Sequence, residues 1–419
     1  MIFKMLKFLN LGHDPSEYID RKNTMRILVF APFFPPDPTG SSIFAGQQVR
    51  ELTRLGHEVF VVTNEIDKNA PTSDETDDVE ARFSPNGVYR LRSIRVNLGR
   101  ITWNYGIPVS FLGFYKRSLQ RRLKEFDSDI VIVHSTLFDL SLLALLWAAK
   151  NKKKVVIVGH TALWHDNQIV NIAMRMYGRL LLRRLINRAD ARLVCVDKWT
   201  LENAIGLFGP SNNTTTIPVS VELGTMNEGN SLKIRTRHDI GIGPVVLSLG
   251  HVVPLRDRLN LTRALPKLVE EFPDVKILVV GMVKDPRFLE LASQLGVLDH
   301  IVLVGPVHHS EIKDYLAAAD METHDLDGRG LGITSVEAMD AGVPIVAWAI
   351  DDNYPQFSLR SYGDSGFIDD GLPETISGAI SRMIRDTEYR ATVIQSQRAL
   401  VDEIYSVESI TKQYLDLFV

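Results

Sequence analysis

The sequence predicts an α/β protein made of two Rossmann-like domains that face each other across a cleft. Three observations predict this fold class. The 419 residues exceed the length of one typical domain. Short apolar runs alternate with glycine-containing loops and helical patterns, which is typical of parallel sheets with helical crossovers. This alternation occurs twice, before and after an irregular polar stretch at 221–243, so we expect one domain on each side.

The first series of elements starts near Met25. Residues 26–31 form an apolar run that enters a proline-rich loop, which predicts a buried strand. A helical pattern closed by Gly56 and a second strand at 58–63 complete a βαβ unit, and such a unit requires a parallel sheet. Further strands are expected at 130–134, 155–158 and 192–196, with a helix in the 140s.

The second series repeats the pattern from Val245. Its expected elements are strands at 245–250, 276–280, 301–304 and 344–347, and helices at 259–271, 286–295, 310–319 and 333–341. In open parallel sheets, ligands bind beyond the carboxyl ends of the strands, so the loops that follow the strands are the candidate sites.

The domain boundaries follow from these two series. We interpret 1–24 as an N-terminal extension and 25–220 as the N-terminal domain, which a C-terminal helix at 400–419 is expected to join. The stretch 221–243 is the expected linker, and 244–399 forms the C-terminal domain.

Composition excludes several classes of protein. A net charge of −4 and a pI of about 6.3 argue against a nucleic-acid-binding protein. No apolar run reaches the roughly 18 residues that a membrane-spanning helix needs. The single cysteine, Cys195, fits a reducing compartment, and its apolar neighbours indicate a buried strand residue rather than a nucleophile. We therefore expect a cytoplasmic protein.

A glycine-rich loop before Ile333 carries the functional prediction. Gly328, Gly330 and Gly332 alternate with other residues, so the backbone can turn sharply and be approached closely. The helical pattern that follows offers free N–H groups and a positive dipole end, which suit a diphosphate. Glu337 lies one turn after Ile333 and could accept hydrogen bonds from two ribose hydroxyls. From the residues alone, a tight turn before a packing helix with an exposed glutamate remains an alternative.

This loop resembles the signature of glycosyltransferase family 4, whose members are retaining enzymes of the GT-B fold. Gly330 and Gly332, with 337–339 and 341–346, match its "GxGxxxxEAMAxGxPVV" motif. The resemblance extends over nearly the whole chain, through 248–256, 279–281, 304–308, 317–320, Phe34-Pro35-Pro36 with Gly40, and 55–59. It implies a hexosyltransferase-type reaction from a nucleotide diphosphate sugar to a hydroxyl of a glycan, glycolipid or lipid-linked intermediate. UDP, GDP and ADP remain open as the nucleotide.

The resemblance also implies roles for individual residues. The C-terminal domain would bind the donor and the N-terminal domain the acceptor. Arg256 would stabilise the leaving diphosphate, and His160, at the carboxyl end of its strand, would reach the donor sugar or the acceptor. No protein nucleophile, metal or further cofactor is expected, because protein cations would do the work of a metal. The expected donor-binding residues are Gly40, His251, Arg329, Gly330, Leu331, Gly332, Ile333, Thr334 and Glu337.

Two positions depart from the family pattern. Arg329 stands where the family has the acid that holds the donor sugar. Asp327, two residues earlier, is the expected substitute, and a different donor sugar or reduced transfer activity remains open. The family's paired Arg and Lys fall on His251 and Arg256. These departures leave open a catalytically impaired donor-binding or partner subunit. A nucleotide-sugar epimerase is a weaker alternative, because no convincing pair of acid and base carboxylates is present.

Two basic segments of the N-terminal half include apolar and aromatic residues. Residues 100–124 combine five aromatic residues with six cations, and 174–188 carry five arginines among apolar residues without one acid. Such faces are typical of interfacial helices on anionic lipid, and equally of a solvated helix face over a core stripe. The first reading favours a lipid-linked acceptor and attachment to the cytoplasmic face of a membrane.

Overall fold

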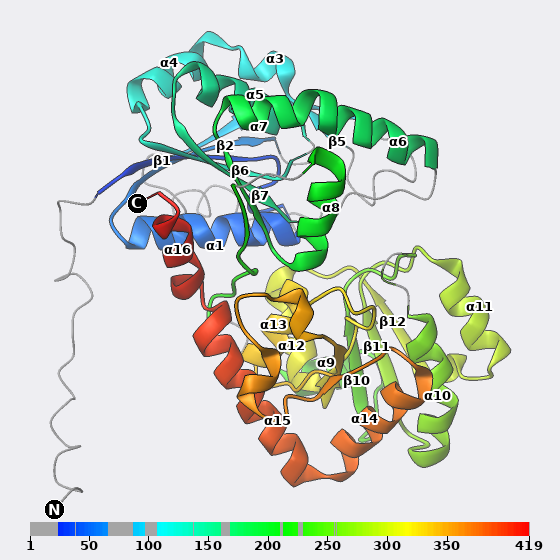
Figure 1. The fold of residues 1–419 in the computed structure, drawn as a ribbon. Helices are drawn as coiled ribbons and strands as arrows, with labels where there is room; N and C mark the ends of the chain where they lie inside the picture. The colour runs from blue at the N-terminus through cyan, green and yellow to red at the C-terminus, as the bar shows by residue number, and fades with distance from the viewer. Residues whose placement is uncertain are drawn as a thin grey trace, which may run out of the picture.

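The computed structural model describes residues 24–37, 39–65, 87–96, 107–136, 138–160, 168–209, 213–224, 229–254, 256 and 258–418. The expected extension lies outside the described residues except for its last residue, and so does 100–106 of the first basic segment. No described helix has both the length and the hydropathy needed to cross a membrane. The predicted fold class is confirmed, since two parallel-sheet domains face each other (Figure 1).

In the described part of the chain, the N-terminal domain contains a seven-stranded parallel sheet of order β3-β2-β1-β6-β7-β8-β9. Its strands are β1 (Arg26–Ala31), β2 (Glu58–Asn64), β3 (Val88–Leu91), β6 (Ile130–His134), β7 (Lys154–Gly159), β8 (Arg192–Cys195) and β9 (Thr214–Thr216). The central strands are buried on both faces, as their apolar runs predict. The edge strands β3 and β9 were not predicted, because they are only four and three residues long, too short for a clear period.

Alternate residues of β1 point into two separate cores. Ile27 and Val29 pack with α1 (Gly40–Arg54) on one face, whereas Leu28 and Phe30 pack on the opposite face. That opposite face is covered by α3 (Phe111–Phe114), α4 (Arg117–Phe126), α5 (Asp139–Lys150), η4 (Gly178–Leu182), α7 (Arg183–Arg188) and α8 (Lys198–Phe208). The helix α6 (Gln168–Tyr177) runs directly into η4, and β4 (Ile94–Val96) pairs antiparallel with β5 (Ile107–Val109).

The C-terminal domain has the parallel order β12-β11-β10-β13, formed by β10 (Val245–Leu249), β11 (Lys276–Val280), β12 (Ile301–Gly305) and β13 (Met321–Glu322). A bridge between Glu322 and Ile345 leads on to β14 (Ala347–Trp348), which pairs with β15 (Phe367–Ile368). Around these strands lie α10 (Leu259–Glu271), α11 (Pro286–Gln294), α12 (Ile312–Ala318), α13 (Ile333–Asp340), α14 (Pro373–Arg385) and α15 (Thr387–Leu400). The strand expected at 344–347 starts three residues later and is shorter.

The chain crosses between the domains twice, and the two crossings lie side by side. The Val221 N–H donates to the Tyr405 carbonyl at 2.8 Å, and the Val407 N–H donates to the Val221 carbonyl at 3.1 Å. After the second crossing, α16 (Val407–Asp416) packs against α1 of the N-terminal domain, where Ile410 and Tyr414 are buried (Figure 1).

The expected linker is not irregular throughout. Within it, α9 (Ser231–Arg237) is capped by Asn230, whose side chain accepts from the Lys233 N–H. Ile234 is fully buried in the core of the C-terminal domain. One buried apolar residue in a seven-residue helix is too short a pattern to be detected as a helical period.

Candidate functional site

The glycine-rich loop between β13 and α13 is held by two of its own aspartates and by Tyr354. The Gly332 N–H donates to Asp325 Oδ2 at 2.6 Å, and the Leu331 N–H donates to the Tyr354 hydroxyl at 2.6 Å. The Arg329 N–H donates to Asp327 Oδ1 at 3.0 Å. The sequence had suggested the N–H of Gly332 for a diphosphate, but in this conformation a carboxylate accepts it.

The first turn of α13 remains available to an anion. Its N-cap, Gly332, provides no side-chain hydrogen bond, so among the described residues the first N–H groups of the helix, those of Ile333 and Thr334, are left uncapped. Gly40, at the start of α1, faces the same point, because a Cβ built on Gly40 would lie 3.6 Å from Ile333 Cγ2. Two helix N-termini, one from each domain, therefore meet where negative charge is favoured.

Arg256 lies at the mouth of this loop. Its side chain is about half exposed, and its Nη1 lies 3.7 Å from Asp325 Oδ1. A Cβ on Gly332 would lie 3.2 Å from that Nη1, so glycine allows the guanidinium to approach the loop closely. Burial raises the pKa of Asp325, but the charges of His324 and Arg256 outweigh it and hold that pKa below its usual value.

His251 does not supply a second cation. Its Nδ1 accepts a hydrogen bond from the Met282 N–H at 3.0 Å, and burial lowers its pKa below the ordinary histidine value. The imidazole is therefore neutral near pH 7, and it points its acceptor at the backbone. The departure from the family pattern at this position removes a charge from the site.

Beneath the loop lies a buried polar network that the sequence had not predicted. His324 Nδ1 contacts Glu322 Oε1 at 2.6 Å, and its Nε2 lies 3.2 Å from Asp325 Oδ1. Arg258, which is 1% exposed, donates its Nη1 to the Arg256 carbonyl at 2.8 Å, and burial lowers its pKa to about 10. Arg258 thus holds the backbone that carries Arg256. In the sequence, this buried network was indicated only by charged residues that lie within or next to short apolar runs.

Glu337 is buried with one oxygen unused. Its Oε1 lies 2.8 Å from His309 Nε2, and its Oε2 has no partner among the described residues. Burial lowers the pKa of His309, but the hydrogen bond to Glu337 outweighs this and raises it overall. The alternative with an exposed glutamate is wrong, since Glu337 is 2% exposed. A buried carboxylate oxygen without a donor is suited to a ligand hydroxyl.

His160 is paired with a second histidine in the wall of the N-terminal domain. Its Nε2 lies 2.9 Å from His134 Nδ1, and the two rings stack with their centroids 5.2 Å apart. Burial lowers the pKa of His160 to about 4 and that of His134 well below its ordinary value, and the Phe44 ring packs edge-on against both. Both imidazoles are therefore neutral near pH 7.

The N-terminus of α8 meets the glycine-rich loop across the domain boundary. The guanidinium carbon of Arg329 lies 4.9 Å from the centre of the Trp199 ring, and its Nη1 lies 3.7 Å from Asp327 Oδ2. Lys198 Nζ contacts Asp352 Oδ2 at 2.5 Å. Arg329, like Asp327, is thus engaged by protein groups.

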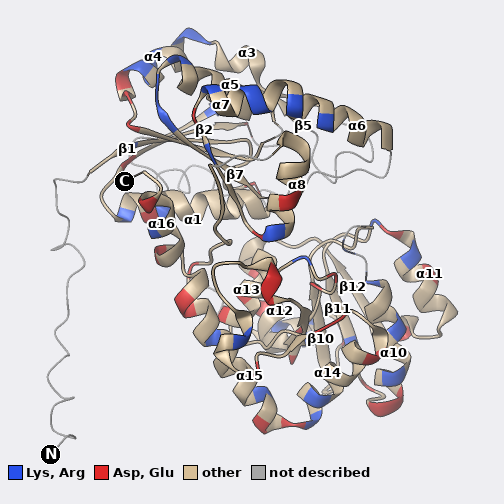
Figure 2. Cartoon of the chain, in the orientation of Figure 1, with Lys and Arg blue, Asp and Glu red and all other residues tan. Residues whose placement is uncertain are grey.

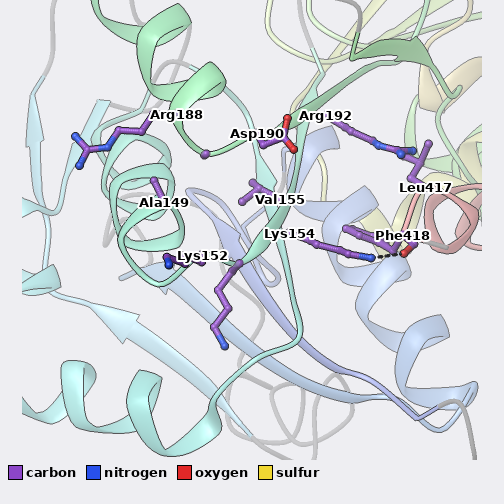
Figure 3. A pocket seen from close by; sticks show the side chains of 11 residues that line it. Ala149, Lys152, Lys154, Val155, Arg188, Asp190, Arg192, Leu417 and Phe418 are labelled. Atoms are coloured by element: carbon purple, nitrogen blue, oxygen red, sulfur yellow. Dashed lines mark hydrogen bonds between the residues drawn. The ribbon is translucent and has the colours of Figure 1, made fainter.

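A hollow of about 430 Å³ lies elsewhere, near the amino ends of β7 and β8 (Figure 3). Its lining includes Lys152, Lys153 and Arg188, and Lys154 donates to the Phe418 carbonyl at 2.7 Å. None of the predicted site residues lines this hollow, so it is not the candidate site. The contacts described above place the candidate site between α13, Arg256 and α8.

The chain matches two family models, described as Glycosyltransferase Family 4 over residues 38–224 and Glycosyl transferases group 1 over residues 233–400. It is 30% identical over 286 residues to the GDP-mannose-dependent alpha-(1-6)-phosphatidylinositol monomannoside mannosyltransferase of Mycolicibacterium smegmatis, a match that covers 66% of this chain and 72% of the relative. The phosphatidyl-myo-inositol mannosyltransferase of the same organism is 28% identical over 379 residues, which cover 88% and 86% of the two chains.

Solved structures show the same fold at low identity. HepE from Anabaena, in complex with UDP, superposes with a TM-score of 0.66 at 16% identity and covers 94% of this chain and 99% of its own. WaaG, a glycosyltransferase involved in lipopolysaccharide biosynthesis, gives a TM-score of 0.60 at 16% identity, with 93% and 99% covered. Both likenesses support the two-domain architecture.

Proposed function

Because the chain belongs to glycosyltransferase family 4, we propose that it transfers a hexose from a nucleotide diphosphate sugar to a hydroxyl of a lipid-linked acceptor, with retention of configuration. The observation that carries the proposal is Oε2 of buried Glu337, which has no partner in the described part of the chain and lies one helical turn from the start of α13. A ribose hydroxyl on Oε2 would direct the diphosphate toward Ile333 and Thr334.

The charges of the site suit the departure of a nucleotide diphosphate. Negative charge would build on the leaving phosphate while the sugar gains oxocarbenium character. Arg256 and the N-termini of α1 and α13 would stabilise that charge without a metal. The departing phosphate would take the proton of the acceptor hydroxyl, so no protein nucleophile is needed.

A membrane surface is the proposed location of the acceptor. No residue of α6 is buried, and Ile169, Ile172 and Met176 are 75%, 55% and 57% exposed. The same helical stretch, through α6, η4 and α7, carries four exposed arginines: Arg175, Arg179, Arg183 and Arg184. Lys and Arg lie along α4, α6 and α7, on the side of the N-terminal domain turned away from the C-terminal domain (Figure 2). Exposed apolar residues together with exposed arginines on one helical stretch fit anionic lipid at the cytoplasmic face.

The donor half of the proposal can be tested by thermal shift with UDP-, GDP- and ADP-sugars, since a ligand stabilises the native state by mass action. We expect one nucleotide class to stabilise the protein, and Glu337→Ala to abolish that shift. Transfer would then be assayed with that donor on vesicles containing phosphatidylinositol, the acceptor class in the names of the mycobacterial relatives. Equal shifts with all three classes, or none, would contradict the proposed donor site.

A catalytically impaired donor-binding subunit is the second candidate. It is favoured by His251, which is neutral and engaged with Met282, and by Arg329 at the position of the family's sugar-holding acid. This candidate requires nucleotide-sugar binding without transfer or hydrolysis across a broad set of acceptors.

A further inference from the structure

The family's sugar-holding carboxylate has no free substitute on the glycine-rich loop. Asp325 accepts from the Gly332 N–H at 2.6 Å and from the Ser335 hydroxyl at 2.9 Å. Asp327 accepts from the Arg329 N–H at 3.0 Å, and the guanidinium of Arg329 lies 3.7 Å from its other oxygen. Both loop carboxylates are thus engaged by the loop itself, and the proposed substitute, Asp327, would have to release Arg329.

A carboxylate from the opposite domain reaches the same place. Asp197 follows β8 and caps α8, with its Oδ1 accepting from the Thr200 N–H at 2.6 Å. Its Oδ2 faces the loop, because a Cβ built on Gly330 would lie 3.4 Å from it. That Cβ would also lie 3.0 Å from the Tyr354 hydroxyl. Gly330, whose φ is +104°, therefore gives the Asp197 carboxylate room beside the loop.

Two side chains of opposite charge each reach across the domain boundary. Arg329 extends from the loop to Trp199 of α8, and Asp197, two residues earlier on the chain, extends from α8 to the loop. Burial raises the pKa of Asp197, as expected for a carboxylate enclosed between two domains, and the charge of Arg256 opposes this effect.

We propose that Asp197 of the N-terminal domain is the carboxylate that binds the hydroxyls of the donor sugar, in place of the acid that Arg329 replaces. The inference rests on the proposed donor site. Because Asp197 and Gly330 belong to different domains, this contact forms only while α8 lies against the loop. Binding of the sugar, in contrast to binding of the nucleotide alone, therefore favours the closed arrangement.

The test compares the affinities of the full chain for a nucleotide diphosphate and for the matching nucleotide sugar, by isothermal titration calorimetry. The variant is Asp197→Asn. Asparagine is as good a helix N-cap as aspartate, so this change removes only the charge. The matched control is Glu202→Gln, because the carboxylate of Glu202 lies on the same helix and its side chain is 62% exposed. We expect Asp197→Asn to weaken nucleotide-sugar binding about tenfold and to leave nucleotide binding within about twofold, since a charged hydrogen bond is lost.

The remaining outcomes of this test would contradict the proposal. If Asp197→Asn keeps the wild-type preference for the nucleotide sugar, or if Asp327→Asn alone removes it, Asp197 does not hold the sugar. Equal wild-type affinity for nucleotide and nucleotide sugar overturns the Asp197 contact while the nucleotide site stands. Absence of binding to either ligand overturns the proposed function itself, and the contact with it.

Discussion

The guanidinium of Arg329 lies over the ring of Trp199, with 4.9 Å between its carbon and the ring centroid, and these two residues belong to different domains. A partly exposed cation–π contact of this kind is worth about 0.5–1 kcal/mol. Together with the ion pair of Lys198 and Asp352, it stabilises the closed arrangement of α8 on the glycine-rich loop.

Loss of this contact should shift the protein toward an open arrangement. We expect Arg329→Gln and Trp199→Leu each to increase the radius of gyration measured by small-angle X-ray scattering without ligand. The double variant should be no more open than either single variant, because both changes remove the same contact. Additive opening would mean that the two side chains act independently.

The pair of His309 and Glu337 predicts a pH-dependent stability. The pKa of His309 is raised in the folded state, so its stabilising contribution is complete below the unfolded value of about 6.5 and is lost as the pH rises through the folded pKa. We expect His309→Gln to lower the melting temperature most below pH 6.5, and the difference from wild type to shrink at higher pH. In a Glu337→Gln background this pH dependence should disappear. A difference that is constant from pH 5.5 to 8.5 would contradict the ion pair.

The central strands and the glycine-rich loop were predictable from the sequence because each depends on neighbouring residues. Apolar runs such as 130–134 become buried strands whatever their partners are. The partnership of Glu337 with His309, 28 residues away, depends on how α13 packs beside η6 (His309–Glu311), and no local pattern encodes it.

Charged residues in unusual environments were the hardest to predict. Arg258 is almost fully buried although arginine is ordinarily exposed, and its environment is set by Glu322 and Asp325 from a distant strand and loop. Asp197 has the sequence context of an ordinary helix cap. Its position against Gly330 results from the packing of the two domains, which the sequence of either domain alone does not specify.

The stacked pair of His134 and His160 predicts sensitivity to acid. Burial lowers the pKa of His160 to about 4, so between about pH 4 and 6.5 the unfolded chain binds a proton that the folded protein does not. Stability therefore falls as the pH falls through this window, by roughly 3 kcal/mol for His160. We expect His160→Phe to melt with a shallower dependence on pH from 6.5 to 4. An unchanged slope would show that other groups cause the acid sensitivity.

Flotation on liposomes tests the exposed apolar stripe of α6 and the arginines of α7. Each arginine near an anionic surface contributes about 1 kcal/mol, so Arg183→Glu with Arg184→Glu should reduce binding to phosphatidylserine vesicles by more than tenfold. Ile169→Gln with Ile172→Gln should reduce binding at high salt as well, because the apolar contribution is not screened. The matched control is Arg263→Glu with Lys267→Glu, two exposed cations on α10 of the other domain. If the control pair reduces binding as much as the α7 pair, the attraction follows from net charge, and α6 does not lie on the membrane.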